Sequence, residues 1–402
     1  MPFFKEAPPA PAIQPTADFP AFLERYRASQ PSIQNFLYLN HASVGPLSDW
    51  VIAAVNEQLA QQQMADSVDQ DPWFDGWRLS RQRVAEYIGA TDRSEVCLLS
   101  STHTALLRAF QAIPIEPGDE VICPADDFPS LYTAMSELTS RGAVLRAVPS
   151  GKGDGIVRTA DMLAAITPKT KVVALSWVNF FHGYTMDLAA IGRAARANGS
   201  WYAVDCMQGL GALTIDVKAT GANFIAGHGA KWLCAPLASG FLWVDPQLDP
   251  EQVTPRTDGW FALELNHLSY TDRSVKPKHN ANRFSLGTVP FPSAFGLRRA
   301  CEIFLEAGPQ RVEERAIGYA DGIADCVRDC GLDLYYDRSE HRSAILSFTL
   351  PAGSPLSDVL KGQKVIHSVR EGKLRLSPHW YHSDAEIDSV CEIIRESAKV
   401  QV

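Results

Sequence analysis

The chain has 402 residues, of which 46% are hydrophobic and 21% are charged, and its formal net charge at pH 7 is −9. This length allows one large domain and a smaller one, each with a core of its own. Negative charge without a basic run argues against a nucleic-acid partner, and no apolar stretch reaches the roughly 20 residues of a membrane span.

The eight cysteines form no Cys-x-x-Cys pair. Scattered thiols of this kind favour a reduced, cytoplasmic protein over a zinc or disulfide function. The N-terminal segment is rich in proline up to Pro20 and lacks the apolar region of a signal peptide. We therefore expect residues 1–35 to form an extended N-terminal arm.

Short apolar runs then alternate with helical patterns such as Ser130–Arg141 and Asp187–Asn198. Strands without polar alternation are typical of a sheet that is buried on both faces. We predict an α/β domain over residues 36–289, with helices covering a mainly parallel, seven-stranded sheet. The expected strands are Val96–Leu99, Glu120–Cys123, Val144–Val148, Lys171–Val178, Trp201–Asp205, Ala222–Ala226 and Gly240–Val244.

After Pro290 the pattern changes. A long helical stretch, Ser293–Cys330, precedes alternating segments at Ser343–Leu350 and Leu374–Ser377, and a last helix is expected from Asp384. Mixed elements of this kind predict a smaller α+β domain over residues 290–402.

Lys231 and Asp205 both follow apolar runs, at the predicted carboxyl ends of two strands. Burial disfavours the charged form of a lysine, which suits an amine that forms a Schiff base. A carboxylate and a lysine at neighbouring strand ends are what a pyridoxal-phosphate (PLP) site requires, because one partners the pyridinium nitrogen and the other forms the imine. A solvated surface lysine is the alternative interpretation of Lys231 alone.

Other polar or aromatic residues follow the same predicted strands, where ligands of α/β sheets bind. Ser101, Thr102 and His103 open a helical pattern, which suits either a phosphate site or an ordinary helix cap. Phe128 could stack on a planar cofactor or serve packing alone. Asn179 and Gln208 could hydrogen-bond a phenolic oxygen, and His228 could donate to a phosphate or be a core histidine.

Seven segments, in chain order, carry a resemblance to known proteins: Tyr38–Pro46, Ser101–His103, Val178–Asn179, Asp205–Gly209, His228–Leu233 with Gly240–Leu242, Arg283–Thr288, and Leu374–Tyr381. Together they resemble motifs of the class V aminotransferase group of PLP enzymes of fold type I. That group includes cysteine desulfurases, isopenicillin N epimerase-like proteins and kynureninase. The dehydrogenase alternative lacks a Gly-x-Gly-x-x-Gly motif after the early strands.

The resemblance implies a role for each candidate. Lys231 would bind the cofactor covalently and move the Cα proton, and Asp205 would hold the pyridine nitrogen protonated. Arg375 would bind the substrate carboxylate, with Asn179 and His41 as further substrate contacts. Thr288 would reach the phosphate of a neighbouring subunit, so a homodimer is expected. The other cofactor contacts implied are Ser101, Thr102, His103, Phe128, Asn179, Gln208 and His228.

The chain departs from the group in two places. The segment Gly362–Gly372 holds no cysteine, which disfavours persulfide chemistry, and Gly229 stands where kynureninase has a tyrosine. The expected function is an aminotransferase that acts at the α-carbon of an amino acid through an external aldimine. The alternatives are an isopenicillin N epimerase-like epimerase, a C–S β-lyase, or an inactive binding protein of the same fold.

Overall fold

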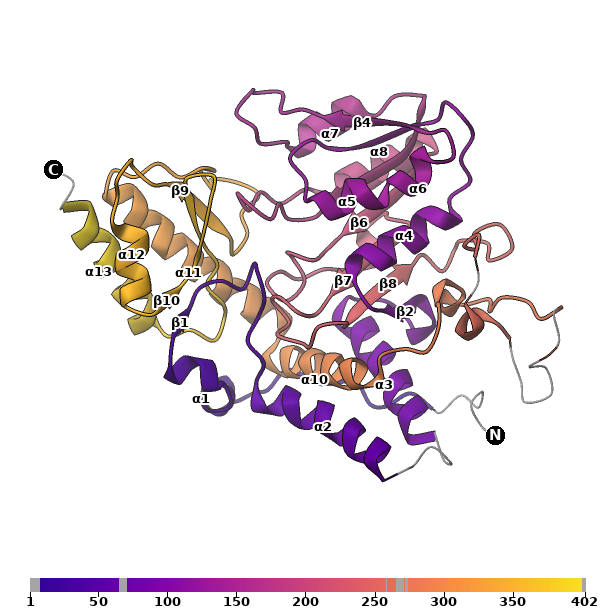
Figure 1. Cartoon of the computed structure of the whole chain (residues 1–402), viewed down its shortest axis with the longest axis horizontal. Coiled ribbons are helices and arrows are strands. Elements are labelled where there is room, and N and C mark those ends of the chain that lie inside the picture. The colour runs from indigo at the N-terminus through magenta and orange to yellow at the C-terminus, as the bar shows by residue number, and fades with distance from the viewer. Residues whose placement is uncertain (1–7, 65–70, 258, 265–270, 272–273, 400–402) are drawn as a thin grey trace.

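The computed structural model of the chain describes residues 8–64, 71–257, 259–264, 271 and 274–399. Its centre is a seven-stranded sheet with the strand order β2-β8-β7-β6-β5-β3-β4 (Figure 1). All neighbours are parallel except β8, which runs antiparallel to β2 and β7. The strands are β2 (Val96–Leu99), β3 (Glu120–Pro124), β4 (Val144–Val148), β5 (Thr170–Ser176), β6 (Trp201–Asp205), β7 (Phe224–His228) and β8 (Gly240–Val244). The predicted sheet is confirmed.

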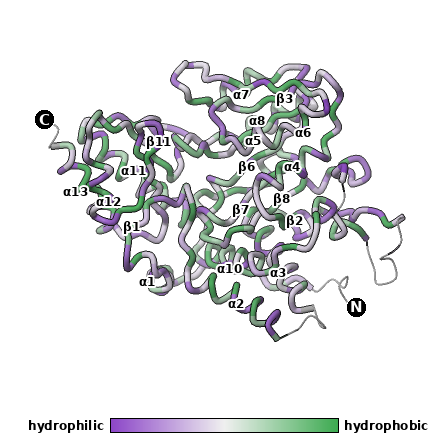
Figure 2. Tube along the Cα trace, viewed as in Figure 1, coloured by the Kyte–Doolittle hydropathy of each residue, from purple (hydrophilic) through white to green (hydrophobic). Residues whose placement is uncertain are grey.

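The sheet is buried on both faces because its apolar side chains alternate between two cores. Val204 and Ile225 belong to one core, whereas Ala203 and Phe224 belong to the other. Hydrophobic residues accordingly run along the central strands (Figure 2). The second core also holds α4 (Thr102–Ala112), α5 (Pro129–Ala134) and α6 (Ser136–Thr139).

The first core takes helices that cover the opposite face. It includes residues of α3 (Asp71–Tyr87), α7 (Thr159–Ala165), α8 (Leu188–Asn198) and α10 (Phe291–Ala307). Helix α10 packs against α3 and against α2 (Asp49–Gln63). It therefore lies with the large domain although it follows Pro290. The remaining short helices of this part are η2 (Arg93–Glu95), α9 (Val217–Thr220), η3 (Trp260–Ala262) and η4 (Ala281–Phe284).

The N-terminal arm is partly helical and packs on its own chain. It contains α1 (Phe19–Ala28) and η1 (Pro31–Gln34). Before α1, the Ala10 N–H donates to the Gln82 side chain at 2.9 Å, and the Thr16 N–H donates to the Glu306 carbonyl at 2.8 Å. The expectation of a wholly extended arm is therefore wrong for Phe19–Ala28. Residues 1–7 lie outside the described part.

A third core lies among the C-terminal elements. A three-stranded antiparallel sheet, in the order β11-β12-β9, packs with α11 and α13. Strand β10 pairs in parallel with β1, which ties the segment before the large domain to the small one. These elements are β1 (Leu37–Tyr38), α11 (Pro309–Asp329), β9 (Leu346–Thr349), α12 (Leu356–Gly362), β10 (Val365–Ile366), β11 (Ser368–Arg370), β12 (Lys373–Leu376) and α13 (Asp384–Lys399).

Two further properties follow from the described residues. None of their helices is long and apolar enough to cross a membrane. Their His, Cys, Asp and Glu side chains form no group that could hold a metal ion, and the cysteines are free thiols.

Candidate active site

A cavity of about 290 Å³ lies at the carboxyl ends of the central strands. Asp205 ends β6 and His228 ends β7, while Ser176 ends β5 and Ser101 follows β2. Strand ends of a parallel sheet meet at one edge, so these residues converge from distant parts of the sequence. The lining residues are Ser43, Val44, Ser101, Thr102, His103, Phe128, Ser130, Ser176, Phe180, Asp205, Met207, Gln208, His228, Ala230, Lys231 and Leu237.

Lys231 and Asp205 form the electrostatic centre of this cavity. Burial raises the pKa of the Asp205 carboxyl, although the Met207 N–H, which donates to its Oδ1 at 2.8 Å, and the Lys231 charge oppose that rise. Burial likewise lowers the pKa of the Lys231 ammonium, against the attraction of Asp205. The Lys231 Nζ lies 5.7 Å from the centroid of the Phe128 ring. Desolvation thus favours the unprotonated amine that a nucleophilic lysine needs.

The start of α4 faces the same cavity with backbone N–H groups. The Ser101 side chain caps the helix by accepting from the Thr104 N–H at 3.1 Å. Within the described chain, the N–H groups of Thr102 and His103 have no protein acceptor. A Cβ at Gly240 would lie 2.6 Å from the Ser101 nitrogen, so only glycine lets β8 approach here. Unpartnered N–H groups at a helix start can bind an anion such as a phosphate.

The segment before α2 closes over Lys231. The Gly45 N–H donates to the Ala230 carbonyl at 2.9 Å, and a Cβ at Gly45 would lie 2.0 Å from the Lys231 carbonyl oxygen. This close approach brings Ser43 and Val44 into the wall of the cavity.

Eight of the predicted site residues line the cavity, namely Ser101, Thr102, His103, Phe128, Asp205, Gln208, His228 and Lys231. Two of them have their polar groups occupied by the protein. The Gln208 amide donates to the Ala42 carbonyl and accepts from the Trp232 indole, both at 3.0 Å. His228 accepts from the Ala230 N–H through Nδ1 at 3.0 Å, and burial together with the Lys231 charge lowers its pKa to about 4. His228 is therefore a neutral imidazole.

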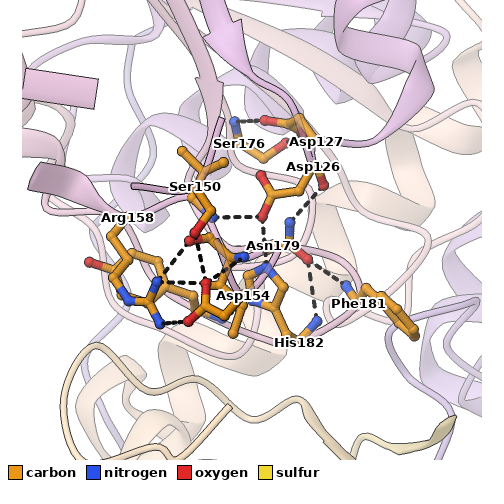
Figure 3. Close-up of polar contacts among 12 residues, drawn as sticks. Asp126, Asp127, Ser150, Asp154, Arg158, Ser176, Asn179, Phe181 and His182 are labelled. Carbon is orange, nitrogen blue, oxygen red and sulfur yellow. Dashed lines mark hydrogen bonds and ion pairs between the residues drawn. The ribbon is translucent and has the colours of Figure 1, made fainter. Parts of the chain in front are cut away.

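Asn179 and Arg375 lie behind the cavity wall. The Asn179 amide donates to the Asp126 carbonyl at 2.9 Å and accepts from the Phe181 N–H at 2.8 Å, so it shapes the turn after β5 (Figure 3). Arg375 is fully buried and donates to the Phe180 carbonyl at 2.6 Å and to the Ser43 hydroxyl at 2.8 Å. Both acceptors belong to lining residues, and the Arg375 Nε has no partner among the described residues.

The structure does not bring His41 or Thr288 to this cavity. His41 is fully buried, and its ring nitrogens contact the Ser377 carbonyl at 3.0 Å and the Tyr381 hydroxyl at 2.7 Å. Its two nitrogens are thus used in packing, and we do not carry His41 into the proposed site. Thr288 is exposed at the surface, away from the lining residues of its own chain.

Sequence reasoning missed several wall residues, among them Ser43, Ser176 and Phe180. It also missed Asp127, whose carboxylate accepts from the Ser176 hydroxyl at 2.5 Å and from the Ser176 N–H at 2.8 Å (Figure 3). Asp127 stands directly before Phe128 in a segment that follows a strand, and that position was the available signal. The loop conformation decides whether Asp126 or Asp127 contacts β5, so the sequence could not distinguish the two carboxylates.

Comparison with known proteins shows the family of this chain. The model of the aminotransferase class-V family matches residues 45–382, and the chain belongs to that family. An uncharacterized aminotransferase of Bacillus subtilis is 24% identical over 90% of this chain and 95% of its own. The isopenicillin N epimerase of Amycolatopsis lactamdurans is 26% identical over 80% of this chain and 84% of its own. The structure of a cysteine desulfurase from Thermococcus onnurineus superposes with a TM-score of 0.82 at 20% identity, covering 98% of this chain and 100% of the other.

The fold is therefore fold type I of the PLP-dependent enzymes, and the cofactor is pyridoxal 5′-phosphate. The residues present fit that group. A buried amine with a lowered pKa suits its aldehyde, a buried carboxyl suits its pyridine nitrogen, and the start of α4 suits its phosphate. The predicted fold and cofactor are confirmed.

Proposed function

We propose that the chain is an aminotransferase that acts at the α-carbon of an amino acid. The observation that carries this proposal is the convergence of Lys231 and Asp205 on one cavity, where burial lowers the pKa of the lysine. When bound, the cofactor supplies an aldehyde for amines and a pyridinium ring that withdraws electrons from the substrate. An unprotonated Lys231 amine can then take the Cα proton as a general base.

The chain's own residues divide the remaining work. Asp205 holds a proton on the pyridine nitrogen, and the N–H groups of Thr102 and His103 bind the phosphate. Arg375 binds the substrate α-carboxylate, which its guanidinium would reach by exchanging its present contacts with Ser43 and Phe180 of the wall. Phe128 contributes an apolar ring surface at the mouth of the cavity, where it is 41% exposed.

The identity of the proton donors favours transamination over the alternatives. Transamination moves one proton between two positions, which the single amine of Lys231 can do. Epimerisation needs a second acid on the opposite face of the substrate, and Phe128 has no proton to give. Transfer of sulfur onto an enzyme thiol needs a nucleophilic cysteine, and none is found among the described residues that line the cavity. We therefore propose transamination as the reaction of this chain.

A homodimer is also part of the proposal. Leu286 is 42% exposed and Thr288 is exposed, on a segment that follows the buried Arg283. An exposed apolar side chain beside a threonine that has no place in its own cavity supports a contact with a second copy of the chain. In that arrangement, Thr288 would complete the phosphate site of the partner.

The first test is covalent attachment of the cofactor. Borohydride reduction of the holoenzyme should link the cofactor to Lys231, as located by peptide mass, and Lys231→Ala should lose that link while it remains folded. Lys278 is the matched control, since burial lowers its pKa to about 8 as well, although it lies outside the cavity. Labelling of Lys278 instead of Lys231 would refute the assignment.

The second test identifies the reaction in a single turnover without an amino acceptor. An aminotransferase releases one equivalent of 2-oxo acid and retains the amino group. An epimerase releases the inverted amino acid and no 2-oxo acid, whereas a lyase releases a thiol or persulfide together with a 2-oxo acid and ammonia. If no amino acid changes the cofactor's absorption, the inactive binding protein is the correct alternative and the proposed function fails.

A further inference from the structure

A second arginine, Arg370, lies beside the cavity and has no role in the contacts proposed so far. It ends β11, and Arg375 lies on β12, which pairs with β11 in an antiparallel ladder. The intervening residues Glu371 and Gly372 have φ angles of 50° and 74°. Positive φ at both central residues is the requirement of a type I′ turn. This tight turn fixes the register, in which Arg370 opposes Lys373.

The register places three cations on one face of the hairpin. Directly opposed residues share a face, and so do residues two apart on a strand. Arg370, Lys373 and Arg375 therefore point to the same side. Arg370 and Arg375 are diagonal neighbours, whose backbone positions are roughly 7–8 Å apart in such a ladder. Like charges so arranged repel one another unless an anion offsets them.

Arg370 contacts the wall of the cavity through one aromatic ring. Its guanidinium carbon lies 5.9 Å from the centroid of the Phe180 ring, and Phe180 lines the cavity and accepts from Arg375. Burial lowers the pKa of both Lys231 and Arg375, and the positive charge of Arg370 lowers both further. Arg370 is half-buried, so its charge acts in a poorly solvated region.

No anion among the described residues neutralises the Arg370 guanidinium. Within the described chain, Arg370 has neither an ion pair nor a side-chain hydrogen bond. Asp205 is the one carboxylate among the described residues that line the cavity. The acids on the outer side, Asp126 and Glu371, add to the raised pKa of Tyr335, which burial causes first. Arg370 thus places a positive charge without a counter-ion from the described residues beside Phe180 of the cavity wall.

Lys373 provides the contrast. Its Nζ lies 4.5 Å from the Tyr335 ring centroid and 5.6 Å from that of Phe181, and neither ring lines the cavity. Arg370 and Lys373 oppose each other on one hairpin but contact different rings. Arg370 lies against Phe180, which lines the cavity, and Lys373 covers an aromatic pair outside it.

We propose that Arg370 binds a second anionic group, on the side chain of the substrate, so that the substrate is an amino acid with an acidic side chain. This inference rests on the proposed function, in which Arg375 takes the α-carboxylate. The planar guanidinium presents paired N–H donors that match a carboxylate, and its apolar flank rests on Phe180. Two arginines on one rigid hairpin would fix both ends of such a substrate.

The test compares each acid with its uncharged amide in the holoenzyme, using glutamate with glutamine and aspartate with asparagine. The better acid should exceed its amide in kcat/KM by about tenfold or more, the effect expected of a charge-assisted hydrogen bond. Arg370→Gln should reduce that ratio to below about threefold, chiefly by raising KM for the acid. Lys373→Gln is the matched control and should keep the wild-type ratio.

Equilibrium binding provides a readout that needs no turnover. Glutarate should bind the wild-type holoenzyme more tightly than butyrate, and Arg370→Lys, which keeps the charge but not the planar fork, should narrow that difference. This variant also serves if Arg370→Gln does not fold. An amide preference in the wild type, or an unchanged acid-to-amide ratio in both Arg370 variants, would overturn the inference while the proposed function stands. A holoenzyme that reacts with no amino acid would instead refute the proposed function, and the inference with it.

Discussion

Asp127 is a second carboxyl group near the cavity, which it does not line, and it contacts the wall residues Phe128 and Ser176. It accepts from the Phe128 N–H at 2.6 Å as well as from Ser176, and Ser176 opposes Asp205 in the β5–β6 register. Burial raises the pKa of Asp127 to about 7, against the hydrogen bonds from Ser176, and the charge of Asp205 adds to that rise. The carboxyl group therefore changes its protonation near neutral pH while it holds Ser176 and the backbone of Phe128.

A raised carboxyl pKa makes the native state bind a proton that the unfolded chain has already released. Between the ordinary value of 3.8 and about 7, the contribution of Asp127 to stability thus falls as pH rises. Asp127→Asn cannot titrate. We expect its free energy of unfolding, relative to wild type, to increase across this interval, whatever its absolute value.

Denaturant melts of the cofactor-free protein at several pH values would measure that difference. Asp161→Asn is the comparison, because Asp161 is a partly exposed carboxylate of a helix cap with no cavity contact. A difference for Asp127→Asn that does not vary with pH would show that Asp127 is charged throughout.

The loop between Lys231 and β8 contains residues in a conformation that favours glycine. Cys234 has a φ angle of 51° and Ala238 one of 62°. A non-glycine residue in the left-handed region destabilises the native state by roughly 1–2 kcal/mol. Replacing it with glycine removes that cost, but the greater conformational freedom of glycine in the unfolded chain offsets about 0.5–1 kcal/mol of the gain. The loop directly after Lys231 is therefore strained.

Ala238→Gly should raise the free energy of unfolding by about 0.5–1 kcal/mol, measured by denaturant melts. Ala194→Gly is the control, since Ala194 lies within α8 and is half-buried as Ala238 is. It should lower stability by about 1 kcal/mol, as glycine does within helices. Equal losses in both variants would mean that the loop is not strained at Ala238.

Element boundaries show where periodicity alone falls short. The pattern predicted a single helix over Ser130–Arg141, but α5 ends at Ala134 and α6 begins at Ser136. The stretch Ser293–Cys330 likewise divides at Gly308, whose φ angle of 90° ends α10, while Pro309 begins α11. An apolar pattern continues across such breaks because both pieces face a core. A glycine followed by a proline was the visible signal at residues 308–309.

The assembly can be tested through its active sites. If Thr288 acts on the phosphate of the partner, Thr288→Glu impairs the site whose lysine belongs to the other protomer. Inactive Lys231→Ala chains, mixed with impaired Thr288→Glu chains, should then regain activity. In a mixed dimer, one of the two sites contains both native residues. Random exchange of equal amounts makes about half of the dimers mixed, so we expect activity per protomer to recover to about a quarter of the wild-type value.

The two variants should be denatured and refolded together, with each refolded alone as the control. Sedimentation would establish that both variants are dimers. An active monomer, or no recovery on mixing, would mean that Thr288 does not complete a partner's site.

Several features could be predicted from the sequence because they depend on local chemistry. Apolar runs specify the buried strands, and the residues that end those strands must meet at one edge of a parallel sheet. Lys231, Asp205, Phe128 and the start of α4 were therefore identifiable, together with the family resemblance that names their cofactor. Their individual roles remain predictions.

Other features were decided by tertiary contacts alone. His41 is occupied by Ser377 and Tyr381, which follow it by more than 330 residues, and the Gln208 amide is occupied by Ala42 and Trp232. The turn after β5, not the residue type, directs Asn179 toward Asp126. The hairpin register likewise brings Arg370 to Phe180, a residue of the cavity wall. A sequence shows which groups can form a hydrogen bond or an ion pair, but their partners depend on packing between segments that are distant along the chain.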